Sequence, residues 1–144
     1  MNELIRKHCC NGAEGGAAAA KWLTIYIEEA HAKDQWHFEE SKVTKELEEL
    51  GDEITTHTTI AERCDVASKF VQRKGLMQDV VCDGMQGQVL DRYQAWPERL
   101  YVIVDGVVVY KGGIGPFHFD LNHLDAWLDE RLGTIPAVAT IDTA

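Results

Sequence analysis

The chain has 144 residues, a formal net charge of −10 at pH 7 and a pI near 4.9. This length allows one domain, and 45% hydrophobic with 26% charged residues is typical of a globular chain that buries a core. The acidic balance argues against nucleic acid as the main partner, because nucleic acid selects Lys and Arg clusters, and no apolar run approaches the roughly 20 residues that a bilayer requires.

The first predicted elements are a helix, a strand and a polar insertion. Asn2 to Lys7 is predicted to be helical. Leu23 to Ile27 is short and rich in β-branched and aromatic residues, which predicts a buried strand that runs into polar residues at its carboxyl end. Ser41 to Leu50 is mostly charged, so we expect a solvated helix or an insertion there.

The helix that follows the insertion has the clearest start signal in the chain. The sequence from Thr59 to Glu62 fits a capping box, and Gly75 is predicted to end the helix. One apolar face is predicted from helical spacing, with the members Ile60, Cys64, Ala67 and Val71.

Two further elements and a hairpin come next. Asp79 to Asp83 is predicted as a short strand, and Gln88 to Trp96 as a helix that the following proline ends. Leu100 to Val104 and Val107 to Lys111 are β-branched runs joined by Asp105-Gly106, a pair that supplies the positive φ angles of a tight turn.

A last amphipathic helix is predicted to open at Asp120 and to stop at Gly133. We therefore expect one domain over residues 1–133 and a loose tail over residues 134–144. The order of elements predicts an α/β layered fold, and a hairpin followed by a closing helix is also how a thioredoxin-like sandwich ends.

The four cysteines predict no metal site and no dithiol motif, because none of them has the Cys-x-x-Cys spacing. Cys64 falls on the apolar helix face and Cys82 in a strand, so both are interpreted as structural. The absence of a signal peptide and the cysteine pattern together predict a reduced, intracellular domain.

Residues Tyr26 to Trp36 read Tyr-Ile-Glu-Glu-Ala-His-Ala-Lys-Asp-Gln-Trp. This stretch closely resembles the Y-I-E-E-A-H-x-x-D-G-W signature of iodothyronine deiodinases, with Gln35 in place of the usual Gly. The resemblance covers roughly residues 1 to 132. Further stretches in register with that family are residues 57–63, 83–86, 98–103 and 110–116.

The resemblance implies a thioredoxin fold in which a selenocysteine, in the turn after the first strand, removes iodine reductively with a thiol reductant. Met1 falls almost on a methionine of that selenocysteine stretch, so we expect the first strand and the selenocysteine to lie upstream of Met1. The absent strand would lie between Leu23 to Ile27 and the hairpin. Without it, Leu23 to Ile27 would have an unpaired edge. Family members are often membrane-anchored through an amino-terminal segment, which leaves the location open.

Four residues near the signature acquire roles through the resemblance. His31 is implied to donate a proton or to bind a phenol, Glu29 to orient that histidine, Tyr26 to line the same pocket and His57 to belong to a proton or thiol relay. From the residues alone, His31 is equally a strand-end surface histidine, Glu29 a solvated carboxylate, Tyr26 a packing residue and His57 a loop residue before a helix.

The glycine-rich loop and the paired cysteines complete the candidate site. Several family members carry a basic residue in this loop that helps to hold the hormone, whereas this chain has Ile114, which cannot supply a charge-assisted hydrogen bond. Cys9 and Cys10 are either resolving thiols for a selenenyl intermediate or small packing residues on an Ala-rich helix.

These observations predict a deiodinase-like oxidoreductase that dehalogenates iodothyronine-like aryl iodides, with no bound cofactor and no metal. Its partners would be a small aryl iodide and a thiol reductant, and a homodimer is one assembly left open. Two alternatives stay open: a peroxiredoxin-like thiol peroxidase and a non-catalytic thioredoxin-fold binding module.

Overall fold

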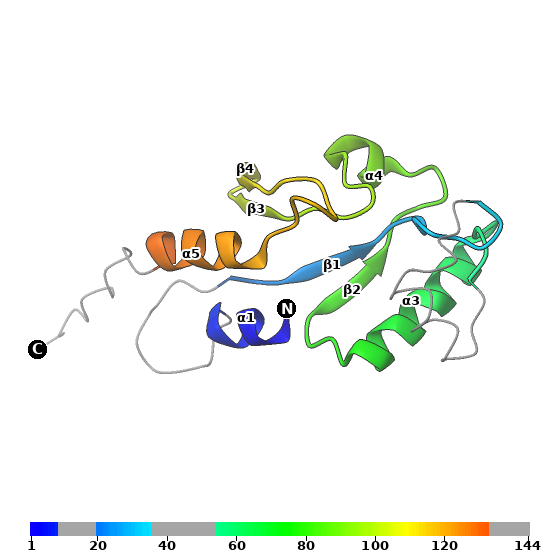
Figure 1. Cartoon of the computed structure of the whole chain (residues 1–144), viewed down its shortest axis with the longest axis horizontal. Helices are drawn as coiled ribbons and strands as arrows, with labels where there is room; N and C mark the ends of the chain where they lie inside the picture. The colour runs from blue at the N-terminus through cyan, green and yellow to red at the C-terminus, as the bar shows by residue number, and fades with distance from the viewer. Residues whose placement is uncertain (9–19, 36–53, 133–144) are drawn as a thin grey trace, which may run out of the picture.

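A computed structural model describes residues 1–8, 20–35 and 54–132 (Figure 1). The predictions for Cys9, Cys10, Ser41 to Leu50 and the tail lie outside these ranges. The described elements confirm a mixed α and β architecture: α1 (Asn2–His8), β1 (Leu23–Tyr26), α3 (Ile60–Lys74), β2 (Asp79–Cys82), α4 (Gln88–Tyr93), β3 (Tyr101–Val104), β4 (Val107–Lys111) and α5 (Leu121–Leu132).

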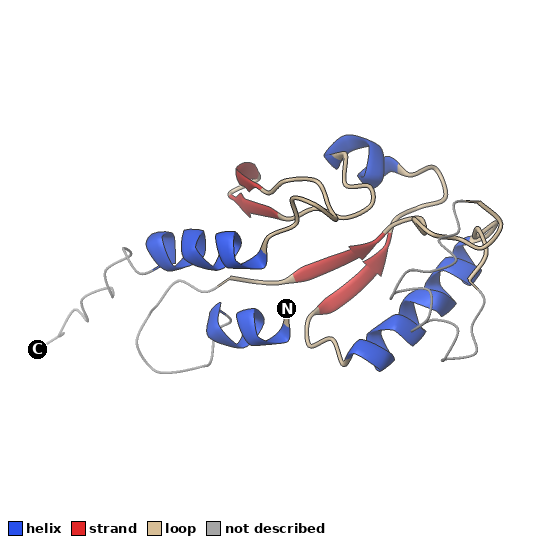
Figure 2. Ribbon diagram, in the orientation of Figure 1, coloured by secondary structure: helices blue, strands red, loops and turns tan. Residues whose placement is uncertain are grey.

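The described strands form two separate two-stranded sheets (Figure 2). β1 and β2 are parallel, in the register that pairs Leu23 with Asp79 and Tyr26 with Cys82. β3 and β4 are antiparallel with an irregularity between Val102 and Ile103. The two turn residues between them both have positive φ, at 51° and 79°, which confirms the predicted hairpin.

The first strand is less buried than the sequence predicts. Leu23 is 57% exposed, and the other residues of β1 are only half-buried. Within the described ranges β1 pairs with β2 alone, so this strand lies at a sheet edge rather than in the middle of a sheet. An edge strand covers less of its surface than a central one.

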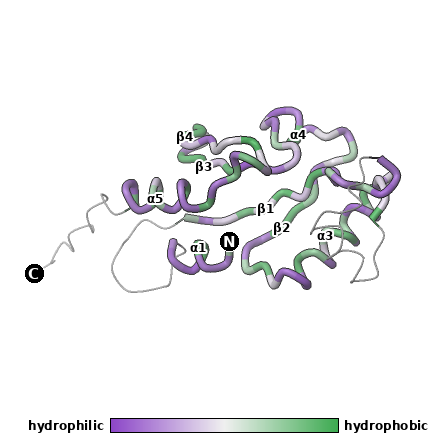
Figure 3. Tube along the Cα trace, viewed as in Figure 1, coloured by the Kyte–Doolittle hydropathy of each residue, from purple (hydrophilic) through white to green (hydrophobic). Residues whose placement is uncertain are grey.

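Helix α3 begins and ends as its sequence predicts. The Thr59 hydroxyl accepts from the Glu62 amide at 3.2 Å, and the Glu62 carboxylate accepts from the Thr59 amide at 3.1 Å. Gly75 ends the helix in the left-handed conformation at φ 56°. Figure 3 shows hydrophobic and hydrophilic residues mixed along this helix.

The buried face of α3 differs from the predicted one. Arg63 and Ala67 are buried, whereas Ile60 is 45% exposed and Cys64 is also exposed. The reason is that the Arg63 guanidinium bonds to backbone carbonyls beyond the end of β2, which turns its side of the helix inward. The interpretation of Cys64 as a residue of the buried apolar face is therefore wrong.

Helix α4 is shorter than predicted, because it ends at Tyr93 rather than at Trp96. Gln94 adopts a left-handed conformation at φ 50°, and the cap donates an amide hydrogen bond to the Leu90 carbonyl. This cap therefore ends the helix, before the proline that was predicted to end it is reached.

The apolar core lies where α5 and α1 meet the hairpin. Leu4, Tyr110, Leu124 and Leu128 form this cluster. The Asp120 carboxylate accepts from two amides of the first turn of α5, at 2.9 and 3.2 Å, which confirms the predicted helix start. No helix in the described ranges is long and apolar enough to span a bilayer.

Candidate functional site

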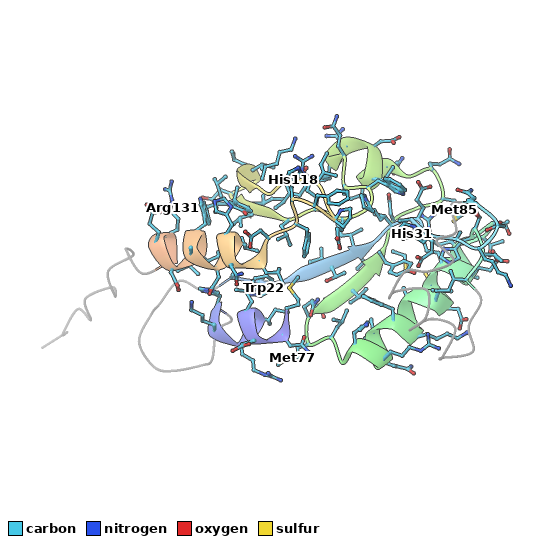
Figure 4. All side chains as sticks on the ribbon, viewed as in Figure 1. Trp22, His31, Met77, Met85, His118 and Arg131 are labelled. Atoms are coloured by element: carbon cyan, nitrogen blue, oxygen red, sulfur yellow. The ribbon has the colours of Figure 1, made fainter. Side chains whose placement is uncertain are left out.

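Polar residues gather where β1 and β2 end. Glu28 to His31 follow β1, and Asp83 to Gln86 follow β2. Because these strands are parallel, their carboxyl ends meet at one edge, which is where α/β folds place ligands. The Asp83 amide extends the pairing with a hydrogen bond to the Tyr26 carbonyl at 2.8 Å. Figure 4 places His31 and Met85 at this end.

The turn after β1 is tied to the segment that precedes α3. The Lys33 amide donates to the Ile54 carbonyl at 2.9 Å. The Asp34 carboxylate accepts hydrogen bonds from the Thr56 amide at 2.7 Å and from the Thr56 hydroxyl at 3.0 Å. The hydrogen bond from the Thr56 amide is the main reason why the pKa of Asp34 is lowered. These bonds hold the segments that carry His31 and His57 side by side.

His57 is buried beside Tyr26 with its polar atoms unused. It is 9% exposed, and its ring centroid lies 6.3 Å from that of Tyr26, which also contacts Phe70 at 6.0 Å. Neither ring nitrogen has a hydrogen-bond partner in the described structure. Burial, followed by the charge of Arg63, lowers the pKa of His57, so its imidazole is neutral at pH 7.

The pKa of Glu29 is shifted in the opposite direction. Its carboxyl is half-buried, and burial raises its pKa. A carboxyl that holds its proton to higher pH lies in the same strand-end region as an imidazole that releases its proton at lower pH. Titratable groups pushed in these directions are typical of sites that move protons.

The sequence analysis missed two buried charged residues beneath this edge. Arg63, 4% exposed, donates through Nη1 to the Asp83 and Gly84 carbonyls, both at 2.9 Å, while its Nε has no partner among the described groups. The Asp83 carboxylate accepts from the Val89 and Leu90 amides at 3.0 to 3.1 Å. Their only sequence signal was their place in the motif stretches 57–63 and 83–86.

Two cavities lie among these segments, and one of them is lined by the buried pair. One, of about 290 Å³, is lined by eight residues that include Arg63, Asp83 and Glu28. The other, of about 160 Å³, is lined by nine residues that include His57 and Arg73. A cavity of about 150 Å³ holds a single benzene ring, so each of these has room for a small aromatic or polar ligand.

Ile114 does not line either of these cavities. It lies 43% exposed in the loop between β4 and α5, where its carbonyl accepts from the His118 amide at 3.1 Å. The adjacent Gly115 packs so closely on the Glu98 side chain that any side chain at this position would collide with it. The structure therefore gathers Tyr26, Glu29, His31 and His57 at one edge and leaves Ile114 in a separate loop.

Three metal-ligating residues come together far from this edge, between α1 and α5. These are His8, Asp125 and Asp129. His8 Nε2 lies 2.6 Å from an Asp125 oxygen, and the Lys7 ammonium contacts the two carboxylates at 2.8 and 2.7 Å. Because Lys7 already supplies the positive charge, this group is an ion network that links the two helices.

Comparison with known proteins adds independent evidence. The family profile described as iodothyronine deiodinase matches residues 13–132. Thyroxine 5-deiodinase of Aquarana catesbeiana is 37% identical over 111 residues, which are 77% of this chain and 38% of that protein. Type II iodothyronine deiodinase of Petromyzon marinus is 34% identical over 125 residues, 83% of this chain and 39% of that protein.

Type I iodothyronine deiodinase of Xenopus laevis is 30% identical over 112 residues, which are 78% of this chain and 40% of that protein. The chain thus spans about two fifths of the length of these curated relatives. The matched region includes the strand-end signature, the segment of His57 and the glycine loop. The chain belongs to the iodothyronine deiodinase family.

Proposed function

We propose that this chain is the proton-handling part of an oxidoreductase that removes iodide reductively from an aryl iodide. The observation that carries the proposal is the strand edge where the segments of His31 and His57 are bonded together and where Glu29 and His57 have oppositely shifted pKa values. Proton transfer by positioned side chains requires such an arrangement.

In the proposed reaction one aryl iodide and two thiols give the deiodinated ring, iodide, one disulfide and one proton. A selenocysteine on a segment preceding Met1 would supply the selenolate that takes up the iodine. His31 donates the proton that replaces iodine on the ring carbon. Glu29 positions His31, and the neutral imidazole of His57 relays a proton toward it.

We also propose a thioredoxin-like sandwich, with a further strand between β1 and β3. The support is that β1 pairs only with β2, and β3 only with β4, in the residues described. Figure 1 shows the hairpin on the side of β1 opposite β2. A strand there would satisfy backbone groups that an edge leaves unpaired.

The substrate class is proposed from the resemblance of the glycine loop, because Ile114 lines neither of the two cavities. Ile114 supplies no charge for a carboxylate, so we propose an iodinated phenol held mainly through its ring and hydroxyl. Iodothyronines and smaller iodophenols both meet this description, and relative rates of iodide release would rank them.

The test uses the full-length gene product, including the segment that precedes Met1, with dithiothreitol as the thiol and release of radioactive iodide as the measurement. His31→Ala should lower the rate about 100-fold or more, the contribution of a general acid. Arg131→Ala is the control, because Arg131 is exposed on α5 and lies at the opposite end of the molecule from His31 (Figure 4); its rate should not change.

Two results would overturn the proposal. One is full iodide release by the His31→Ala protein. The other is a wild-type protein that reduces hydrogen peroxide with thiols and releases no iodide, which would instead support the thiol peroxidase alternative.

A further inference from the structure

The larger cavity at the strand edge combines one buried guanidinium with three carboxylates. Arg63, which is 4% exposed, lines it together with Glu28, Asp83 and Asp91. Asp83 is 3% exposed, whereas Glu28 and Asp91 are exposed. The positive charge therefore lies inside the protein, and two of the three negative charges lie at its surface.

The Arg63 guanidinium has an unused hydrogen-bond donor. Its Nη1 donates to the Asp83 and Gly84 carbonyls at 2.9 Å, whereas its buried Nε has no partner among the described groups. Both of these bonds go to backbone carbonyls, so within residues 1–8, 20–35 and 54–132 no carboxylate forms an ion pair with Arg63. Buried donors are normally satisfied, so this one calls for an acceptor from outside the chain.

The segment that carries two of the carboxylates is held by backbone hydrogen bonds. The Gly87 amide donates to the Gly84 carbonyl at 3.0 Å, and the Asp91 amide donates to the Gly87 carbonyl at 2.9 Å. The Asp83 carboxylate is occupied by two amides of α4, at 3.0 to 3.1 Å. These bonds preorganise the turn between β2 and α4, which lowers the cost of ordering it around a ligand.

The charges around the cavity determine which ligands fit. Three carboxylates against one guanidinium disfavour a simple anion such as phosphate or iodide. A simple cation would leave the Arg63 Nε without an acceptor, because a cation offers none. A ligand with a negative group toward Arg63 and a positive group toward the exposed carboxylates satisfies both conditions. The α-amino-acid headgroup is a compact group of this kind, with a carboxylate and an ammonium on one carbon.

We infer that this cavity binds the zwitterionic α-amino-acid headgroup of a small molecule. The carboxylate of the ligand accepts a hydrogen bond from Arg63 Nε, and its ammonium lies toward Glu28 and Asp91. The cavity volume of about 290 Å³ is almost twice the roughly 150 Å³ that holds a benzene ring, so the headgroup and a side chain both fit. The inference goes beyond the proposed deiodination and does not depend on it.

Two kinds of molecule relevant to the proposed reaction carry this headgroup. One is an amino acid with an iodinated phenol ring, and its probe is iodotyrosine. The other is a thiol, and its probe is cysteine. Each probe has one analogue without the carboxylate, iodotyramine or cysteamine. Each also has one without the ammonium, iodohydroxyphenylpropionate or mercaptopropionate.

Isothermal titration calorimetry with the full-length gene product measures the affinity for each of these six compounds, in the presence of a phosphine that keeps the thiols reduced. In at least one series the zwitterion should bind about 10-fold or more tightly than either analogue, because each analogue loses one charge-assisted interaction. The series that shows this difference identifies the source of the headgroup.

Removal of one exposed carboxylate gives a result that a folding defect cannot imitate. Asp91→Asn should weaken binding of the amine analogue several-fold and strengthen binding of the propionate analogue, because one attraction and one repulsion disappear together. Asp79→Asn is the matched control. Asp79 is exposed at the start of β2, whereas the cavity lies beyond the end of that strand, so all affinities should stay unchanged.

Three results would overturn the inference: no binding of either zwitterion, equal binding of a zwitterion and one of its analogues in both series, or equal effects of Asp91→Asn and Asp79→Asn. None of these measurements involves iodide release. Failure of this inference is therefore distinguishable from failure of the proposed deiodination.

Discussion

The two halves of the molecule bury different kinds of residue. Around the hairpin, α1 and α5 the buried cluster consists of Leu4, Tyr110, Leu124 and Leu128, and the one buried polar residue described there, His8, is bonded to Asp125. Around β1, β2 and α3 the buried set includes His57, Arg63 and Asp83, and both histidine ring nitrogens and the arginine Nε have no partner in the described residues.

The two kinds of burial have opposite effects on the stability of the fold. Apolar burial contributes about 25 cal/mol per Å², whereas an unpartnered buried polar atom costs about 1–3 kcal/mol. The unpartnered atoms of His57 and Arg63 therefore oppose folding, as do Asn2 Oδ1 and Trp22 Nε1 beside the core, and the apolar cluster offsets them. Buried polar groups without partners call for an explanation, and the proton-transfer site that we propose provides one.

The largest expected effect on stability comes from creating a cavity in the apolar cluster. Leu128 is 3% exposed in the core cluster, so Leu128→Ala should lower the free energy of unfolding by about 3 kcal/mol through lost burial and a cavity. Urea denaturation followed by circular dichroism measures it. The exposed neighbour Ala126, changed to Ser, is the control and should stay within about 0.5 kcal/mol. Equal effects of the two changes would contradict the assignment of the core to this face.

A smaller loss of stability is expected from a substitution in the half around β1, β2 and α3, together with a shift in the pKa of His57. Arg63→Met removes two charge-assisted hydrogen bonds and leaves the Asp83 and Gly84 carbonyls without that donor, which should cost about 2 kcal/mol. Because the Arg63 charge helps to lower the pKa of His57, that pKa should rise in the variant.

Titration of the His57 ring protons by nuclear magnetic resonance measures this shift. Arg92→Met serves as the control, because Arg92 is exposed on α4 and does not contribute to the pKa of His57. An unchanged His57 pKa in the Arg63→Met protein would show that the Arg63 charge does not help to lower it.

Local sequence signals predicted most elements because each signal acts within a few residues. The capping box at Thr59, the Asp105-Gly106 turn and the Asp120 start all appear as predicted. The resemblance names His31 from the strand-end signature and His57 from the separate stretch 57–63, and their roles stay predictions. The bonds of Asp34 to Thr56 hold the two segments together.

What the sequence could not predict depends on contacts between distant segments. An arginine on a helix is expected to point to solvent, so the burial of Arg63 follows only from carbonyls twenty residues away. Such pairings have no fixed spacing in the chain that a motif could record.

The smallest effect tests the same contrast through pH. The folded-state pKa of His57 lies below its ordinary value of 6.5, so between these two values the unfolded chain binds a proton that the folded chain does not. Stability should therefore fall as the pH is lowered below about 6.5 toward the folded pKa. His57→Gln removes this dependence and should flatten the loss between pH 7.5 and 5.5 in urea denaturation.

Glu29 acts with the opposite sign, because its raised folded-state pKa makes the folded chain bind the extra proton and gain stability as the pH falls toward 4.5. That contribution is present in wild type and in the His57→Gln protein alike, so the difference between them isolates the imidazole. His118→Gln supplies the matched exposed histidine and should follow the wild-type profile. If His118→Gln flattens the profile as much as His57→Gln, the acid sensitivity belongs to surface charge, and the contrast between the apolar half and the half proposed to handle protons loses its thermodynamic support.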